Sequence, residues 1–389
     1  MPLGARTNLL RVRHGHDHSR VTFVELFFDL VFVFAVTQLS HTLLERPTAL
    51  GFAQTMLLLL AVWWVWIDTS WATNWLDPQT APVRLMLFAM MLAGLVLSIS
   101  IPHAFDSSGP AFAAAYVVMQ VGRCLFVMWC LRRYSVGNFR NFQRITAWRA
   151  FAGVFWIAGA VADGDARFGL WASALFLDCL SPAVGFYVPG LGRSTVADWD
   201  VEGSHMAERC GLFIIIALGE SILVIGATFG KLPWAATTIA AFLASFVGSI
   251  AMWWIYFNIG AEKASHTISV SADPGRLARL AYTYFHLPIV AGIIVSAVAD
   301  ELVLTHPVGH IDLNTTFAVL GGPTLYLLGN ILFKRAIWGR LPLSHLVGLG
   351  LLVLLIPVAA VASPLALGAA ATLILVIVGA WETRSLRSP

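Results

Sequence analysis

Long apolar runs recur along almost the whole chain, and they restrict the fold more than any other feature of the sequence. A helix of about 20 apolar residues spans the hydrocarbon core of a bilayer. Charged residues make up only 12% of the chain and its mean hydropathy is +0.79, whereas a soluble domain carries about a quarter charged residues. The sequence therefore predicts an all-α polytopic membrane protein whose main partner is the lipid bilayer.

Twelve of these runs are long enough to cross a membrane, and each is ended by Pro, Gly or charged residues. The predicted membrane-spanning helices cover residues 21–44, 50–72, 82–102, 110–132, 145–162, 166–187, 206–228, 234–258, 278–299, 314–337, 343–362 and 364–383. An even number of spans places both ends of the chain on the same side of the membrane.

The basic residues test this count, because cytoplasmic loops of membrane proteins are enriched in Lys and Arg. With the N-terminus inside, twenty of the 24 Lys and Arg residues fall in predicted cytoplasmic segments. Arg46, Arg167 and Lys231 fall outside, and Arg123 lies within a span. A span missed early in the chain would invert every later loop and remove this bias. The pattern therefore favours twelve spans with both termini cytoplasmic.

The same pattern predicts the domain organisation. Residues 1–20 are polar and basic and precede an apolar run too long for the core of a signal peptide, so they predict a cytoplasmic tail. A first six-helix repeat at 21–187 is followed by a cytoplasmic linker at 188–205. A second six-helix repeat at 206–383 leads to a C-terminal tail at 384–389.

Short matching words in the same order support an internal repeat. The pairs are "WWVWID" (63–68) with "WWIYFN" (253–258), "AGLVLS" (93–98) with "AGIIVS" (291–296), and "VGRCLF" (121–126) with "LGNILF" (328–333). Each word alone is weak, because small apolar words recur by chance, but their order is shared. Two six-helix halves would be parallel, since six is an even number of crossings.

Two carboxylates sit one helical turn apart in the first apolar run. Glu25 and Asp29 share a helix face, while Gln38 and His41 lie on a different stripe near the outer end. Two ionised carboxylates about 6 Å apart repel by nearly 3 kcal/mol at an effective dielectric constant of ~20. Unless a cation lies between them, one should hold a proton near neutral pH, which is the behaviour of a proton- or cation-coupled site.

A structural interpretation of the same carboxylates stays open. Glu25 and Asp29 lie near the predicted cytoplasmic interface, where Arg20, Arg84 or Arg209 could pair with them. Such pairs would lock helices together without moving any charge.

The seventh predicted helix carries a second set of polar residues. Arg209 and Glu220 are eleven residues apart, which returns to nearly the same face about 16 Å along the axis. His205 and Glu208, spaced i and i+3, are weak candidates for a metal or proton pair, although a helix-capping role explains them equally well. The candidate coupling or pathway residues are thus Glu25, Asp29, Gln38, His41, Glu208, Arg209 and Glu220.

Other polar residues favour structural interpretations. Arg123 in the fourth span needs an acidic partner, and Asp178 in the sixth is the predicted one, as a buried structural pair. The "HGHDH" tract at 14–18 resembles a metal-binding sequence, but a solvated tail explains it. The cysteines are interpreted as buried small apolar residues: Cys124, Cys130, Cys179 and Cys210.

Two further clusters, one of acidic and His residues and one of tryptophans, lie near the predicted ends of spans. Acidic and His residues precede the tenth span and could form an outer acidic vestibule: Asp300, Glu301, His306, His310 and Asp312. Tryptophans at the end of the second span are interpreted as an aromatic belt at the inner interface: Trp63, Trp64, Trp66, Trp71 and Trp75.

Several function classes lack their motifs. The sequence holds no phosphate-binding P-loop, no GxSxG or HExxH motif and no CxxC pair. It has no soluble stretch large enough to bind ATP, and nothing beyond the cytoplasmic basic loops suggests nucleic-acid binding. The sequence assigns no catalytic residues, and it names neither a cofactor nor an oligomeric state.

Two motifs resemble the bacterial low temperature requirement protein A family. They are "VELFFDLVFVFAVTQLS" in the first span and "HMAERCGLFIIIALGESIL" in the seventh, and the likeness extends from Arg20 to about Trp381. The resemblance implies a protein of the bacterial cytoplasmic (inner) membrane. It implies no catalytic or ligand residues, because the biochemical activity of the family is poorly defined.

Three functional interpretations follow. The leading one is a transporter or channel for a small solute or ion, with a pathway between the halves and Glu25, Asp29 and Glu220 as coupling sites. The second is a membrane-embedded enzyme or cofactor-binding protein that uses these carboxylates with His41 or His205 in a closed pocket. The third is a structural or sensory membrane protein whose polar residues only hold helices together.

Overall fold

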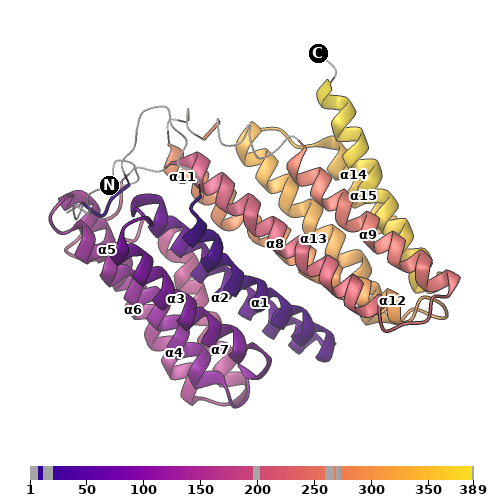
Figure 1. The fold of residues 1–389 in the computed structure, drawn as a ribbon, viewed down its shortest axis with the longest axis horizontal. Coiled ribbons are helices and arrows are strands. Elements are labelled where there is room, and N and C mark those ends of the chain that lie inside the picture. The colour runs from indigo at the N-terminus through magenta and orange to yellow at the C-terminus, as the bar shows by residue number, and fades with distance from the viewer. Residues whose placement is uncertain are drawn as a thin grey trace. The chain divides into compact units, whose positions relative to one another are not determined.

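The fold was examined in a computed structural model. It describes residues 8–11, 21–195, 202–258, 267–268, 271 and 273–387. The HGHDH tract, Arg20 and part of the predicted linker lie outside these residues. Figure 1 shows that the described chain is built from helices.

The chain divides into two compact units. Unit 1 is Met1–Thr42, Leu50–Met206 and Asp273–Arg276, and unit 2 is Leu43–Ala49, Ala207–Ala272 and Leu277–Pro389. The main boundary, at Met206, falls at the end of the predicted linker 188–205.

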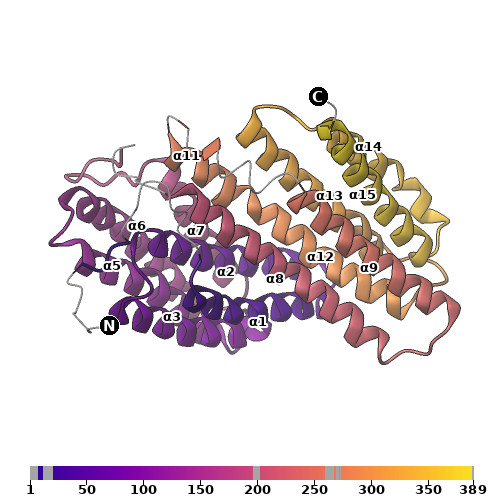
Figure 2. The same cartoon turned by 45° about the horizontal axis from the view of Figure 1, so that its top comes forward.

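Unit 1 is formed mainly by a bundle of helices that run side by side in both views (Figures 1 and 2). Its elements are α1 (Phe23–Glu45), α2 (Ala49–Trp75), α3 (Ala81–Ser100), η1 (Ile101–His103), α4 (Gly109–Val117), η2 (Val118–Gly122), α5 (Arg123–Leu131), α6 (Val136–Val161) and α7 (Gly164–Ala183). The π-helical turn η2 joins α4 and α5 into one continuous span, Gly109–Leu131.

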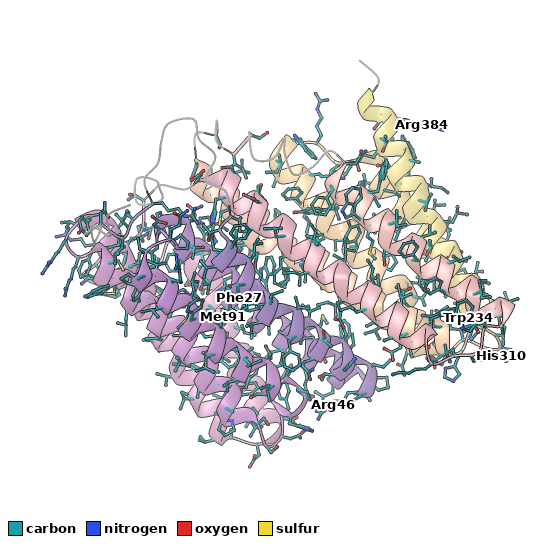
Figure 3. The ribbon with its side chains drawn as sticks, viewed as in Figure 1. Phe27, Arg46, Met91, Trp234, His310 and Arg384 are labelled. Carbon is teal, nitrogen blue, oxygen red and sulfur yellow. The ribbon has the colours of Figure 1, made fainter. Side chains whose placement is uncertain are left out.

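Unit 2 contains most of the remaining helices. They are α8 (Gly203–Phe229), α9 (Ala236–Phe257), α11 (Pro274–Ala278), η4 (Arg279–Tyr284), α12 (His286–Thr305), α13 (Leu313–Trp338), α14 (Leu343–Leu354), η5 (Pro357–Ala360) and α15 (Pro364–Arg387). The first turn of α8, up to Met206, and residues Pro274–Arg276 of α11 belong to unit 1. Figure 3 shows Arg384 at one end of this unit and Trp234 with His310 at the other. Arg384 and the pair Trp234 and His310 thus mark the two opposite ends of the helices in unit 2.

All twelve predicted spans coincide with helix, and ten helices among the described residues are long and apolar enough to cross a membrane. The protein is thus a polytopic helical membrane protein. The two remaining ranges correspond to α6 and α7, which are 26 and 20 residues long. They are more polar because they carry buried charges, including Arg149, Arg167 and Asp178.

Local sequence signals explain several helix ends. The Ser135 hydroxyl accepts a hydrogen bond from the Asn138 N–H (3.3 Å) at the start of α6, and the Asp312 carboxylate accepts one from the Thr315 N–H (2.6 Å) at the start of α13. Gly339 ends α13 with a φ of +67°, a left-handed conformation that glycine adopts without strain.

The structure corrects three interpretations made from sequence. The helix that contains the fifth predicted span begins at Val136 rather than residue 145, so Arg149 lies about 20 Å into α6 instead of near a loop. Asp300 and Glu301 lie within α12 and not in an outer loop. The tryptophans of α2 are buried inside the protein rather than forming an interfacial belt.

Helices α12 and α13 of unit 2 approach each other closely. A Cβ atom added to Gly292 would lie 2.7 Å from Tyr326 Cα and 2.8 Å from the Gly322 carbonyl oxygen. Backbone therefore packs directly on backbone here, as small residues allow in membrane helix pairs.

Candidate functional site

The Glu25 carboxylate, fully buried at the start of α1, is the centre of a polar cluster in unit 1. Its oxygens accept hydrogen bonds from Arg11 Nη2 at 3.0 and 2.9 Å and from His205 Nε2 at 2.8 Å. The backbone N–H and hydroxyl of Thr22 donate to Oε2, both at 2.9 Å. The charge of this carboxylate is therefore compensated by a salt bridge and by neutral donors.

The hydrogen bonds of Asn74 define the tautomer of His205. Asn74 Oδ1 accepts from the Glu202 N–H (3.0 Å), and Asn74 Nδ2 donates to the Glu202 carbonyl (2.9 Å). Nδ2 also faces His205 Nδ1 at 3.3 Å, so Nδ1 must accept and Nε2 must carry the proton given to Glu25. Arg11 Nη2 lies 3.1 Å from Nε2, and both are donors that share the same carboxylate.

Arg11 also ties the described N-terminal residues to the end of α2. Its Nε donates to the Thr73 carbonyl (2.6 Å) and the Leu76 carbonyl (3.2 Å), while its backbone N–H donates to the Trp75 carbonyl (2.9 Å). From the sequence, Arg11 is one of several basic residues in the predicted tail 1–20, and nothing there indicates a carboxylate partner. Arg84, named there as a partner for the carboxylates, is exposed and donates to the Gln79 carbonyl instead.

Replacing Glu25 by Gln tests this anchoring. The amide would direct N–H groups at Arg11, Thr22 and His205, and hydrogen bonds to charged groups contribute about 1.5–3 kcal/mol each. We expect amide hydrogen exchange in residues 8–11 to accelerate by about 10- to 100-fold, measured by mass spectrometry. Glu45→Gln, at the exposed end of the same helix, is the control. Equal exchange in both variants would show that Glu25 does not hold this segment.

Asp29 lies one turn farther along α1 and is 2% exposed. The indole Nε1 of Trp66 on α2 donates to its Oδ1 at 2.8 Å. A neutral N–H donor can bond either protonation state of a carboxyl group. This buried tryptophan thus serves as a polar partner of Asp29 within unit 1.

A four-residue charge network replaces the expected Arg123–Asp178 pair. Arg123 contacts Asp68 (3.2 Å), whereas Asp178 contacts Arg149 (2.6 Å), and Arg149 also contacts Asp68 (2.8 Å). The pairing differs because α6 begins early enough to carry Arg149 to the depth of Asp178. Two arginines and two aspartates balance each other in a buried setting, which favours a structural role.

Aromatic and amide groups complete this network. Tyr116 donates its hydroxyl proton to Asp178 Oδ2 (2.8 Å) and accepts from Gln120 Nε2 (3.3 Å). Gln120 lies in the π-helical turn η2, and its Oε1 accepts from Arg123 Nη2. π-Helical turns are frequent at functional positions, because they redirect side chains that a regular helix would place elsewhere.

The polar residues of α8 differ in burial. Arg209 and Glu220 are buried, at 0% and 2% exposure, while Glu208 is exposed. His205 is buried and Glu208 is exposed, although three residues along a helix place them about one turn apart. Among the described residues, no group of three His, Cys, Asp or Glu side chains is placed to hold a metal ion.

The polar residues near the C-terminal end of α1 do not join these clusters. His41 is exposed and Gln38 is half-buried. The backbone carbonyl of Gln38 accepts a hydrogen bond from the Thr42 hydroxyl (2.7 Å), a local contact within the helix.

Unit 2 holds two buried polar clusters that the sequence analysis missed. Lys334 Nζ contacts both oxygens of Glu382 (2.5 and 2.7 Å) and faces His345 Nε2 at 3.2 Å. His286, fully buried, lies with Nε2 2.7 Å from the Tyr256 hydroxyl and Nδ1 2.8 Å from the Ala281 carbonyl. Lys334 lies within the predicted span 314–337, and a charged residue inside a span was the signal available to find this cluster.

Comparisons with known proteins agree along the whole chain. The profile of the Bacterial low temperature requirement A protein (LtrA) family matches residues 20–380. The uncharacterized protein RA0937 of Rhizobium meliloti (strain 1021) is 41% identical over 387 residues, covering 98% of this chain and 93% of that protein. No solved structure matches. On the extent of the profile match, the chain belongs to the bacterial low temperature requirement A family.

Proposed function

We propose that the protein is a transporter or channel for a small solute or ion, with buried carboxylates as proton- or cation-coupling sites. The observation that carries this proposal is the burial of Asp29 and Glu220, each 2% exposed, within spans of a polytopic membrane protein. Ionisable groups within spans are costly and rare, and they mark ion and proton pathways in many membrane proteins.

We propose different roles for Glu25 and for the other two carboxylates, Asp29 and Glu220. Glu25 accepts from Arg11, His205 and Thr22, which favours a permanently paired anchor. Asp29 and Glu220 lie deeper within their spans, and Asp29 accepts a hydrogen bond from the Trp66 indole. We propose coupling at Asp29 and Glu220 because both are buried within spans, and a positioning role for Glu25.

The other interpretations have less support. An embedded enzyme would place Glu25 and His205 beside a cavity, yet the acceptor positions of Glu25 are occupied by donors of the chain itself. A purely structural protein would tolerate neutral isosteres at Asp29 and Glu220. Measuring ion flux in variants with neutral isosteres at Asp29 and Glu220 therefore distinguishes a transporter from a purely structural protein.

Reconstituted protein tests the proposal. Proteoliposomes loaded with a pH-sensitive dye are exposed to proton, Na⁺ and K⁺ gradients, with protein-free vesicles as the baseline. We expect wild-type flux above baseline and a loss of about tenfold or more in Asp29→Asn and Glu220→Gln, because each removes an ionisable group from a span. Glu208→Gln, at an exposed position of α8, should retain wild-type flux.

Two results would contradict the proposal. Wild-type flux equal to protein-free vesicles under every gradient would reject transport coupled to protons, Na⁺ or K⁺. Normal flux in both carboxylate variants would keep transport but reject the coupling residues.

A further inference from the structure

A small cavity, partly open to the protein surface, lies in unit 2 among α9, α12, α13 and α15. Its volume is about 40 Å³, and its polar lining residues are Ser245, Ser296, Asp300 and Thr372. One water needs about 10–15 Å³ of such space. The cavity can therefore hold a dehydrated ion with one or two waters.

Ser296 provides the first sign of an occupant. The residue lines the cavity and is 6% exposed, and its Oγ has no hydrogen-bond partner among the described residues. Leaving a buried hydroxyl unsatisfied costs free energy. Ser296 precedes Asp300 by one turn of α12, so both side chains lie on the same helix face.

The charge of the site points to a cation. Asp300 and Ser245 both line the cavity. Among the described residues that line the cavity there is no Lys, Arg or His, and Asp300 forms no salt bridge in that part of the chain. A single carboxylate balances one positive charge.

Every polar group at the site is an oxygen, from a carboxylate or a hydroxyl. Pro323 on α13 lacks the backbone N–H that would bond the Val319 carbonyl four residues earlier, and both residues line the cavity. Hard cations prefer oxygen ligands, and backbone carbonyls released from helix bonding coordinate Na⁺ in transporters.

We propose that the cavity bordered by Asp300, Ser296 and Ser245 binds one small monovalent cation of the Na⁺ class. Asp300 supplies the compensating charge, and the hydroxyls supply neutral oxygens. The cavity lies about 8 Å from the end of α12, the end of unit 2 at which Figure 3 labels His310. This site goes beyond the proposed transport function, because it requires equilibrium binding whether or not any ion crosses the membrane.

Equilibrium binding of ²²Na⁺ to the purified full-length protein in detergent tests the site. Choline chloride replaces NaCl to hold the ionic strength constant. We expect saturable ²²Na⁺ binding, weakened about tenfold or more in Asp300→Asn and several-fold in Ser296→Ala, since each removes a ligand oxygen or its charge. Glu301→Gln, on the same helix but outside the cavity lining, should bind as wild type does.

Gel filtration identifies variants that have lost the native state. If Asp300→Asn is not monodisperse, Ser296→Ala carries the test, because it removes one oxygen and no charge. The proposal is overturned if wild-type protein shows no saturable ²²Na⁺ binding, or if the folded variants bind as wild type does. This experiment measures binding and not flux. Its outcome is therefore independent of whether the vesicle experiment detects transport.

Discussion

Arg149→Met should destabilise the protein strongly, because it removes the arginine that pairs with the buried Asp178 and leaves the half-buried Asp68 with Arg123 alone. Arg149 bridges the two carboxylates at 2.8 and 2.6 Å and is 2% exposed. Removing one partner of a buried ion pair costs about 3–5 kcal/mol. We expect a correspondingly lower midpoint of unfolding in an SDS titration of the purified protein.

Arg140→Met is the matched control for this variant, because Arg140 lies on the same helix but is exposed. The double variant Arg149→Met with Asp178→Asn should recover part of the loss, since it removes the orphaned charge together with its partner. An Arg149→Met protein as stable as the Arg140→Met protein would show that the network contributes nothing to stability.

Gly292→Val should separate α12 from α13. The added Cβ would need to occupy space 2.7 Å from Tyr326 Cα, and backbone atoms cannot move aside as side chains can. Overpacking a core costs about 1–3 kcal/mol and more where no side chain can yield, so we expect about 3 kcal/mol or more. The same SDS titration measures the loss.

Gly321→Val supplies the control for helix propensity. An added Cβ there meets no atom within 4 Å, although Gly321 lies on α13 as Gly322 does. Valine is no worse than glycine inside a helix, so this variant should unfold close to the wild-type midpoint. Equal losses at positions 292 and 321 would refute the close packing of the two helices.

The helical class and the position of each helix could be predicted from the sequence, because apolar length is a local property. Burial of Glu25, Asp29 and Glu220 could be predicted too, since each lies within an apolar run. The start of α6 could not, because its first turns carry Arg140 and Arg144 and therefore resemble a loop.

Partners were harder to predict than positions. The sequence predicts Asp178 as the partner of Arg123. Because α6 begins earlier than predicted, Asp178 pairs with Arg149 instead. The tryptophans of α2 show the same limit, because Trp is common both at interfaces and in buried cores. Asp300 was assigned to a loop since the first charge after an apolar run is the usual signal for its end.

The contact between Glu25 and His205 joins residues 180 positions apart. A ribosome adds about 5–20 residues per second, so Glu25 is synthesised roughly 10–40 s before His205. During that interval the carboxylate can bind Arg11 and Thr22, but its imidazole partner does not yet exist. Assembly of unit 1 therefore ends only after the first turn of α8 has been translated. A fragment of the chain designed to fold as unit 1 should extend through Met206 rather than stop after α7.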